Sequence, residues 1–317
     1  MPPNPPIKPS LHPRNKNRER YDLEALLRVK PELAAHIKPN KHGAESIDFA
    51  QPAAVKLLNQ ALLHHYYGIA HWDFPDENLC PPIPGRADYL HYVADLLAEG
   101  NDGNIPTGDQ IKCLDVGVGA SAIYPIIGVV EYGWHFIGSD TDDNSLASAQ
   151  KIVEANKALQ GKIELCMQTD RKVFFKGVLS PDDKIDLTLC NPPFHASMDD
   201  ARKGTRRKVR NLSGQQTASP TLNFSGSRSE LVYAGGEARF IQKMARESQH
   251  FAEQCLWFTT LVSKQVNLKP LYTALKKAKA LEVKTIPMGT GNKSTRIVAW
   301  TFLTPEAQQA WRESRWQ

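Results

Sequence analysis

The stretch best suited to chemistry is residues 187–197, LTLCNPPFHAS, where an apolar run ends in Asn191, two prolines and Phe194. Each proline lacks an N–H and fixes its own φ, and a residue before proline is kept out of helical conformation, so the turn is stiff. It can hold the Asn191 carboxamide and the Pro192 carbonyl as two fixed acceptors for the N–H groups of an amino group conjugated to a ring. The nitrogen is then drawn towards tetrahedral geometry, and its lone pair becomes available as a nucleophile. Phe194 offers a face on which a flipped base stacks. The alternative interpretation is a strand-end turn without a catalytic role.

A glycine-rich turn lies at residues 113–125, CLDVGVGASAIYP, where Asp115, Gly117 and Gly119 follow an apolar run. Glycines at such a turn let the backbone approach a ligand closely. The dinucleotide pattern GxGxxG is incomplete because Ala122 occupies its third glycine position. The spacing is more typical of S-adenosylmethionine sites, where no pyrophosphate has to be held.

Two acids follow further apolar runs. Asp140 ends WHFIGSD, 23 residues after Gly117, and is placed to accept hydrogen bonds from a ribose; alternatively it caps the next helix. Asp170 follows KIELCMQT and is a candidate for the adenine amino group, or else an ordinary loop aspartate.

The elements that must position these residues form an alternating pattern from residue 111 onward. Apolar runs predict strands at 111–117, 134–140, 162–167, 184–190, 255–262, 281–288 and 296–303. Helical spacing appears at 141–159 and 237–254, so most of the sheet should be parallel and covered on both faces. The last two strands are separated by too few residues for a crossover helix and should form an antiparallel hairpin. The pattern resembles the Rossmann-like, seven-stranded α/β sheet of class I S-adenosylmethionine-dependent methyltransferases.

The chain divides into three regions. We expect a proline-rich, basic arm at 1–20, a helical N-terminal region without strands at 21–100, and the methyltransferase domain at 101–317. A Ser/Gly/Arg-rich insert at 196–229 interrupts that domain directly after the Asn-Pro-Pro-Phe turn, which suggests a binding loop.

Composition excludes several classes of protein. The 317 residues are 41% hydrophobic and 23% charged, with no apolar run of the roughly 20 residues that a membrane helix needs. The N-terminus carries no secretory signal, and the five scattered cysteines predict neither disulfides nor a zinc site, so we expect a cytoplasmic protein. His64, His65, His71 and His195 lack metal-ligand spacing, and no metal is expected.

Positive charge is concentrated in two segments, 12–21 and 201–210, within a net charge of +5. Such runs commonly contact nucleic-acid phosphates, although a solvated surface run or a tail explains them as well. The candidate RNA contacts are Arg14, Lys16, Arg18, Arg202, Lys203, Arg206, Arg207, Lys208 and Arg210.

Several blocks together resemble the ribosomal RNA large-subunit methyltransferase F family and its eukaryotic relatives, the methyltransferase-like sixteen group. They are HPRN (12–15), IPGRADYLHYVADLL (83–97), LDVGVGASAIYP (114–125), CNPPFHAS (190–197), GGE (235–237) and GNKSTRIVAWTFL (291–303). The resemblance implies methylation of N6 of adenine 1618 in 23S ribosomal RNA, with S-adenosylmethionine as cofactor. The partner would be 23S RNA or a large-subunit assembly intermediate.

The resemblance also implies roles around the cofactor. Arg86 should hold its carboxylate, and Gly117 and Ser121 its methionine portion. Asp140 should bind the ribose and Asp170 the adenine end; the eukaryotic relatives have glutamate at the position of Asp140.

For catalysis, the resemblance implies that Asn191, which also faces the cofactor, acts together with Phe194. Two kinds of alternative stay open. One keeps the chemistry but changes the acceptor to guanine N2 or a protein glutamine amide. The other is a non-catalytic RNA-binding assembly factor that retains the cofactor site.

Overall fold

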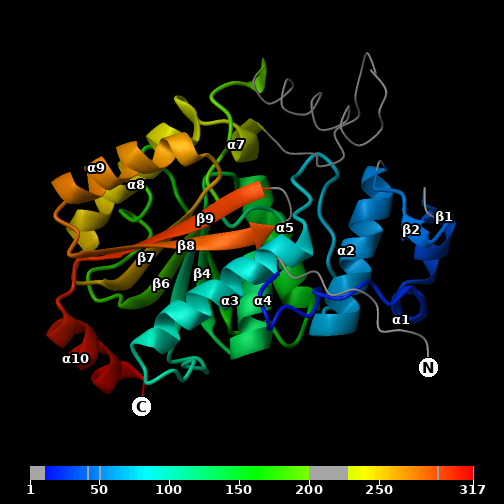
Figure 1. The fold of residues 1–317 in the computed structure, drawn as a ribbon, viewed down its shortest axis with the longest axis horizontal. Helices are drawn as coiled ribbons and strands as arrows, with labels where there is room; N and C mark the ends of the chain where they lie inside the picture. Colours follow the sequence, from blue (N-terminus) through cyan, green and yellow to red (C-terminus); the bar gives the residue numbers. More distant parts are fainter. Residues whose placement is uncertain (1–10, 41–42, 50, 200–227, 291–292, 317) are drawn as a thin grey trace.

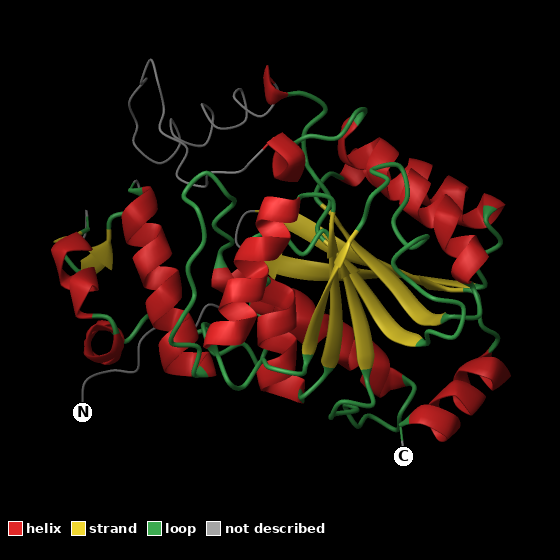
Figure 2. Ribbon diagram, turned by 180° about the vertical axis from the view of Figure 1, so that it is seen from behind, coloured by secondary structure: helices red, strands yellow, loops and turns green. Residues whose placement is uncertain are grey.

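The fold centres on a seven-stranded sheet. In this computed structural model the described residues are 11–40, 43–49, 51–199, 228–290 and 293–316. The strands are β3 (Lys112–Val116), β4 (His135–Asp140), β5 (Ile163–Met167), β6 (Ile185–Cys190), β7 (Cys255–Val262), β8 (Glu282–Thr290) and β9 (Lys293–Thr301). Their order is β5-β4-β3-β6-β7-β9-β8, and Figure 2 shows them as a twisted fan. Strands β3 to β7 pair in parallel and β9 pairs antiparallel with β7 and β8, so the predicted class I methyltransferase sheet and its terminal hairpin are confirmed.

Helices cover both faces of the sheet, as Figure 1 shows. The apolar sides of α2 (Pro52–Tyr67), α3 (Ile83–Glu99), α4 (Ile123–Tyr132) and α5 (Asp143–Ala155) belong to one core. Those of α8 (Gly236–Ser248) and α9 (Leu268–Lys277) belong to a second core on the opposite face. Every residue of β6 and β7 is buried, which explains why these strands are continuous apolar runs rather than alternating ones.

The N-terminal region corrects one expectation. Besides α1 (Leu23–Val29), the 3-10 helix Pro31–His36 and α2, it contains the antiparallel strands β1 (Ile37–Pro39) and β2 (Glu45–Ile47). The prediction that this region lacks strands is therefore wrong. Each strand has only three residues, and of the six only Ile47 is buried, so the sequence carries no detectable alternation there.

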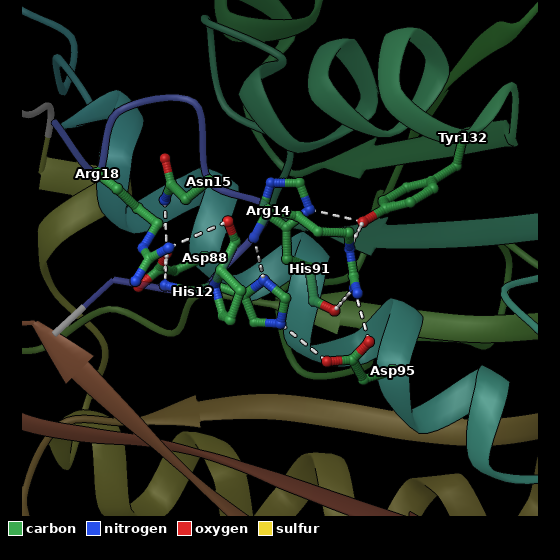
Figure 3. A network of polar contacts seen from close by, with 9 residues as sticks. His12, Arg14, Asn15, Arg18, Asp88, His91, Asp95 and Tyr132 are labelled. Atoms are coloured by element: carbon green, nitrogen blue, oxygen red, sulfur yellow. Dashed lines mark hydrogen bonds and ion pairs between the residues drawn. The ribbon is translucent and has the colours of Figure 1, made fainter. Parts of the chain in front are cut away.

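The described part of the expected N-terminal arm is attached to the folded body, as Figure 3 shows. His12 is 3% exposed, and its backbone N–H donates to Asp88 Oδ1 of α3 at 3.0 Å. The Asn15 amide donates to the same oxygen at 2.5 Å. His12 Nδ1 accepts from the N–H of Arg14, so Nε2–H donates to Asp95 Oδ2, at 2.8 Å. Residues 11–18 thus form a clamp on α3, which we call the N-terminal clamp.

The C-terminal helix α10 (Pro305–Arg315) is held by one buried acid at the start of β6. Asp186 is fully buried and accepts from the indole N–H groups of Trp311 and Trp316, both at 2.7 Å, and from the N–H of Lys112 at 2.8 Å. This acid therefore fixes the end of β6 remote from Asn191. Among the described residues, no helix has both the length and the apolar character that crossing a bilayer requires.

Candidate active site

A pocket opens where the parallel strands end. The register pairs Val116 of β3 with Ser139 of β4 and with Cys190 of β6, so the residues following these three strands meet at one edge of the sheet. This is the switch point of the strand order, where α/β sheets bind their ligands. The pocket has a volume of about 180 Å³. Its lining includes Arg86, Gly117, Gly119, Ser121, Tyr124, Asp140, Gln168, Arg171, Asn191, Pro193, Tyr233 and Phe240.

The turn after β3 forms the floor of the pocket. Gly117 and Gly119 have φ of 80° and 65°, a region that residues with a Cβ rarely adopt. A Cβ added to Gly117 would meet no atom within 4 Å, so this backbone faces open space. The N–H groups of Gly117 and Val118 donate to Ser139 O at 2.8 and 2.9 Å, which joins the turn to β4.

Asp140 connects that turn to the start of α5. Its Oδ2 accepts from Gly119 N at 2.9 Å, and its Oδ1 accepts from the N–H groups of Thr141 and Asp142. Burial raises the pKa of Asp140, and these three N–H groups act against that shift by stabilising the carboxylate. The N-cap of α5 is Asp142 rather than Asp140. Asp140 is thus a half-buried acceptor that lines the pocket.

Arg86, in the first turn of α3, brings a positive charge to the pocket. It is 9% exposed and donates to Tyr124 Oη at 2.6 Å, with its guanidinium 5.3 Å from the centroid of that ring. Asp115 lies behind it, 1% exposed. Burial raises the pKa of Asp115 to about 8, although the charge of Arg86 acts in the opposite direction. Both carboxylate oxygens of Asp115 and the Nε of Arg86 lack a partner among the described residues.

Asn191 begins the stiff turn at the end of β6. Its Oδ1 is buried with no partner in the described part of the chain, and the residue lines the pocket together with Pro193. Buried amide oxygens are rarely left without a donor, so the position suits a ligand N–H. Pro192 is buried beneath the turn and lies outside the pocket lining.

On its β7 side, the backbone just before Asn191 is held by side chains instead of by a regular ladder, whereas on the other side Cys190 still pairs with Val116 of β3. The parallel pairing of β6 with β7 ends at Leu187 and Trp257. Beyond them, Cys190 N donates to Tyr89 Oη at 3.2 Å, Tyr89 Oη meets Thr259 Oγ1 at 2.7 Å, and Thr259 Oγ1 donates to Thr188 O at 2.5 Å. Because the Thr259 proton is used on Thr188, Tyr89 is the donor in the middle bond. This relay of hydroxyl groups ties the last residue of β6 to α3 and β7.

The aromatic side chains at the pocket differ from those expected. Phe194 is half-buried but does not line the pocket, whereas Tyr233 and Phe240 do. They are brought there because His195 N donates to Leu231 O and Tyr233 N donates to His195 O, both at 3.1 Å. Sequence reasoning missed these two rings, although the GGE block begins only two residues after Tyr233.

At the end of β5 the pocket residue is Gln168 rather than Asp170. Asp170 is exposed, outside the pocket lining, and accepts from Lys172 N at 2.8 Å. Gln168 is 5% exposed, donates to Lys176 O at 3.0 Å and accepts from Asp170 N at 2.9 Å. No signal in the sequence distinguished Gln168 from its neighbours.

The predicted RNA contacts at the N-terminus lie in the clamp. Arg14 donates to Asp95 Oδ1 at 2.7 Å and to His91 O at 2.9 Å, and Lys16 pairs with Glu131 at 2.8 Å. None of Arg14, Lys16 and Arg18 lines the pocket. The cations at 202–210 lie outside the described residues. Within the described ranges, no group of three His, Cys, Asp or Glu side chains is arranged to hold a metal ion.

The expected cofactor fits the donor and acceptor set of this pocket. The carboxylate of an amino acid complements the Nε of Arg86, which lines the pocket and has no partner among the described residues. Asp115, a predicted cofactor residue, is buried behind the lining and does not itself reach the pocket. The accepting carboxylate of Asp140 suits ribose hydroxyl groups. Residues from β3, β4, α3 and β6 could therefore hold S-adenosylmethionine together.

Comparisons with known proteins agree with this geometry. A family model described as RNA methyltransferase matches residues 6–304. Ribosomal RNA large subunit methyltransferase F of Cytophaga hutchinsonii is 52% identical over 314 residues, covering 99% of this chain and 98% of that protein. The protein of the same name from Ectopseudomonas mendocina is 55% identical, with 98% and 94% covered.

Solved structures of lower sequence identity also resemble this chain. The human METTL16 catalytic domain in complex with MAT2A 3′UTR hairpin 1 has a TM-score of 0.78 and 28% identity, covering 93% of this chain and 96% of that one. The N-terminal domain of human METTL16 in complex with SAH has a TM-score of 0.73 and 26% identity, covering 93% and 99%.

Proposed function

Because the chain belongs to this family of RNA methyltransferases, we propose that it methylates large-subunit ribosomal RNA, with S-adenosylmethionine as cofactor, at N6 of an adenosine. The nucleotide is adenine 1618 of 23S RNA, as the resemblance to the methyltransferase F family implies. The RNA is presented either free or within a large-subunit assembly intermediate.

The observation that carries the proposal is the buried Oδ1 of Asn191, which has no hydrogen-bond partner among the described residues. Asn191 lines the same pocket as the glycine turn after β3. An exocyclic amino group supplies the N–H that this oxygen lacks. Its second N–H can be accepted by the Pro192 carbonyl, which the proline ring holds rigidly. With both N–H groups engaged, the nitrogen lone pair faces the pocket, in line for attack on the methyl group that bound S-adenosylmethionine would supply.

When bound, S-adenosylmethionine supplies an electrophilic methyl group on a sulfonium. The residues of this chain do the rest by positioning. Arg86, held by Tyr124, binds the carboxylate, and Asp140 binds the ribose. Gln168, in place of the expected Asp170, offers its side chain at the adenine end. Positioning supplies most of the rate gain, so no titratable side chain is required as a base, and the proton that the amino group loses passes to water.

Tyr233 and Phe240 give the target base its stacking surface in the resting pocket. Phe194 adds its ring from the turn once the base has entered. Aromatic faces accept any base, so the acceptors at Asn191 and Pro192 select for an exocyclic amino group, and the choice of adenine follows from the resemblance to the methyltransferase F family.

The test uses radiolabelled S-adenosylmethionine with unmodified large-subunit ribosomal RNA, followed by nucleoside analysis. We expect N6-methyladenosine from the wild-type protein. We expect Asn191→Ala to abolish transfer, because the amino group loses an acceptor, while RNA affinity stays within a few fold. Label in N2-methylguanosine or in a glutamine amide would overturn the assignment of the acceptor. An unaltered rate in Asn191→Ala would overturn the catalytic role, and no transfer by the wild type would favour an assembly factor.

A further inference from the structure

Helices α8 and α9 form one continuous surface on the outer face of the sheet. The two helices lie side by side in Figures 1 and 2. Their inward positions, including Ile241, Met244, Leu271 and Leu275, are fully buried in the second core. Their remaining positions therefore face solvent and make up what we call the α8–α9 surface.

The acids of α8 do not contribute to the outward charge of this surface. Glu237 is 2% exposed and accepts from Ser263 N at 2.7 Å and from the Asn267 amide. Glu247 accepts from three consecutive backbone N–H groups, those of residues 174–176, at 2.8 to 3.0 Å. Both carboxylates are thus committed to neighbouring backbone and side-chain donors.

The cations of the same segment remain outside. Residues 236–281 contain eight lysines and arginines against three glutamates, and the third glutamate, Glu253, lies just before the amino end of β7. Residues 263–281 contain five lysines and no acid. The cations are Arg239, Lys243, Arg246, Lys264, Lys269, Lys276, Lys277 and Lys279.

The lysines of α9 have no side-chain partner within the described ranges of the chain. Lys269 and Lys276 are exposed and stand seven residues apart on one face, about 10 Å along the helix axis. Neither forms an ion pair with any residue that the structure describes. Their ammonium groups are therefore available to the phosphates of a polyanion.

The surface begins at the pocket. Phe240 of α8 lines the pocket, and its neighbour Arg239 is exposed. Lys243 Nζ lies 5.7 Å from the ring centroid of Tyr233, which also lines the pocket. Lys264 follows the carboxyl end of β7, at the edge of the sheet where Asn191 lies. A strand with one base in the pocket would therefore meet positive charge as it leaves across α8 and α9.

We propose that the α8–α9 surface binds the phosphate backbone of the RNA strand flanking the target nucleotide. The inference rests on the proposed function. It assigns RNA contacts to α8 and α9, in addition to the basic segments 12–21 and 201–210 that the sequence alone suggested. Phosphate contacts of this kind supply affinity and register without reading sequence.

The experiment compares two double variants that remove equal charge. Lys269→Gln/Lys276→Gln alters the α8–α9 surface, whereas Lys151→Gln/Lys157→Gln alters exposed lysines on and just after α5, on the other face of the sheet. RNA affinity is measured from low to moderate salt, and cofactor affinity is measured alongside as a check on the fold.

For the first variant we expect RNA affinity to fall about tenfold and the slope of log affinity against log salt to decrease by about 2, with cofactor affinity unchanged. The second variant should behave like the wild type. Equal slopes and affinities for the two variants, in a wild type that methylates RNA, would overturn this inference alone. A wild type that neither binds nor methylates RNA would overturn the proposed function as well. If the first variant loses cofactor affinity, Lys277→Gln/Lys279→Gln takes its place with the same expectations.

Discussion

The side chain of Asn191 depends on hydroxyl groups that lie behind it. Tyr89 is fully buried, and its hydroxyl takes the N–H of Cys190, which would otherwise lack a partner where β6 and β7 diverge. The same hydroxyl donates a hydrogen bond to Thr259 Oγ1. A buried N–H left without an acceptor costs about 1–3 kcal/mol, and the backbone would move to avoid that cost. Tyr89 is thus a positioning residue for the Asn191 carboxamide.

Tyr89→Phe keeps the ring and removes the relay. We expect kcat to fall about ten- to a hundredfold, because a shift of about 1 Å in a positioned group has an effect of that size. The Kd for the cofactor should stay within about twofold of the wild-type value, since Arg86 and Asp140 are untouched. Steady-state kinetics and cofactor titration separate the two effects.

Thr259→Ser is the matched control, because it keeps the hydroxyl that accepts from Tyr89 and should retain most of kcat. A Tyr89→Phe enzyme with the kcat of the wild type would show that the relay has no positioning role. A loss of cofactor affinity equal to the loss of kcat would mean that the change acts through the fold.

At the scale of elements, α3 connects the cofactor site to the N-terminal clamp. Arg86 points to the pocket and Tyr89 to the relay, whereas Asp88, His91 and Asp95 follow one another at helical spacing on the side that meets the clamp. Tyr132 Oη accepts from Arg14 Nε, which leaves its own proton to be donated to His91 Nδ1, 2.6 Å away. The helix that places Arg86 is therefore fixed on its other side by residues 11–18.

The clamp predicts a pH dependence of stability. Burial, with the nearby charges of Arg14 and Lys16, lowers the pKa of His91 from 6.5 to about 3. The folded protein therefore keeps His91 neutral while the unfolded chain takes up a proton, and stability is lost as pH falls from 6.5 towards 3. The loss from this group amounts to about 2 kcal/mol at pH 5.

His91→Gln offers Tyr132 a carbonyl acceptor that does not titrate. Denaturant unfolding of both proteins at pH 7 and pH 5 measures the effect, and the difference between the two pH values should shrink by about 2 kcal/mol in the variant. Carboxylates that titrate in the same pH range contribute equally to the two proteins, so their effect cancels when the variant is compared with the wild type. If stability changed by the same amount between pH 7 and pH 5 in both proteins, His91 would take up its proton as readily in the folded protein as in the unfolded chain.

At the scale of the whole molecule, positive charge is found outside the pocket as well as in it. The basic run at 201–210 follows the Asn-Pro-Pro-Phe turn in sequence, and the cationic α8–α9 surface begins beside the same turn. A net charge of +5 is modest, so the placement of the cations matters more than their number. The RNA role of Arg202, Lys203 and Arg210, like that of Arg14, Lys16 and Arg18, stays a prediction.

Replacing Arg206, Arg207 and Lys208 together by glutamine should weaken RNA binding and reduce the salt slope by about 3, if each cation meets a phosphate. Filter binding across a salt series measures it, with cofactor affinity as the control. Combined with Lys269→Gln/Lys276→Gln, the losses in binding free energy should add, because separate contacts are independent. Unchanged binding of the triple variant at low and moderate salt would assign the run to ordinary solvated surface.

Much of this architecture follows from the sequence. All seven sheet strands are apolar runs of strand length, and the short link between the last two forces them antiparallel. Gly117 and Gly119 mark a turn with positive φ because few other residues adopt it. Asn191 and Asp140 meet this turn because parallel strands place their carboxyl ends together.

Only the tertiary structure decided the contacts between residues that lie far apart in the chain. Tyr89 meets Thr259 across 170 positions, and His12 meets Asp88 across 76. No periodicity encodes such pairs, because they arise from the packing of α3 against β7 and of the N-terminal clamp against α3. Packing likewise decided that Gln168, and not the predicted Asp170, lines the pocket. Local pattern fixes which residues form each element, and packing selects which of their side chains face the ligand.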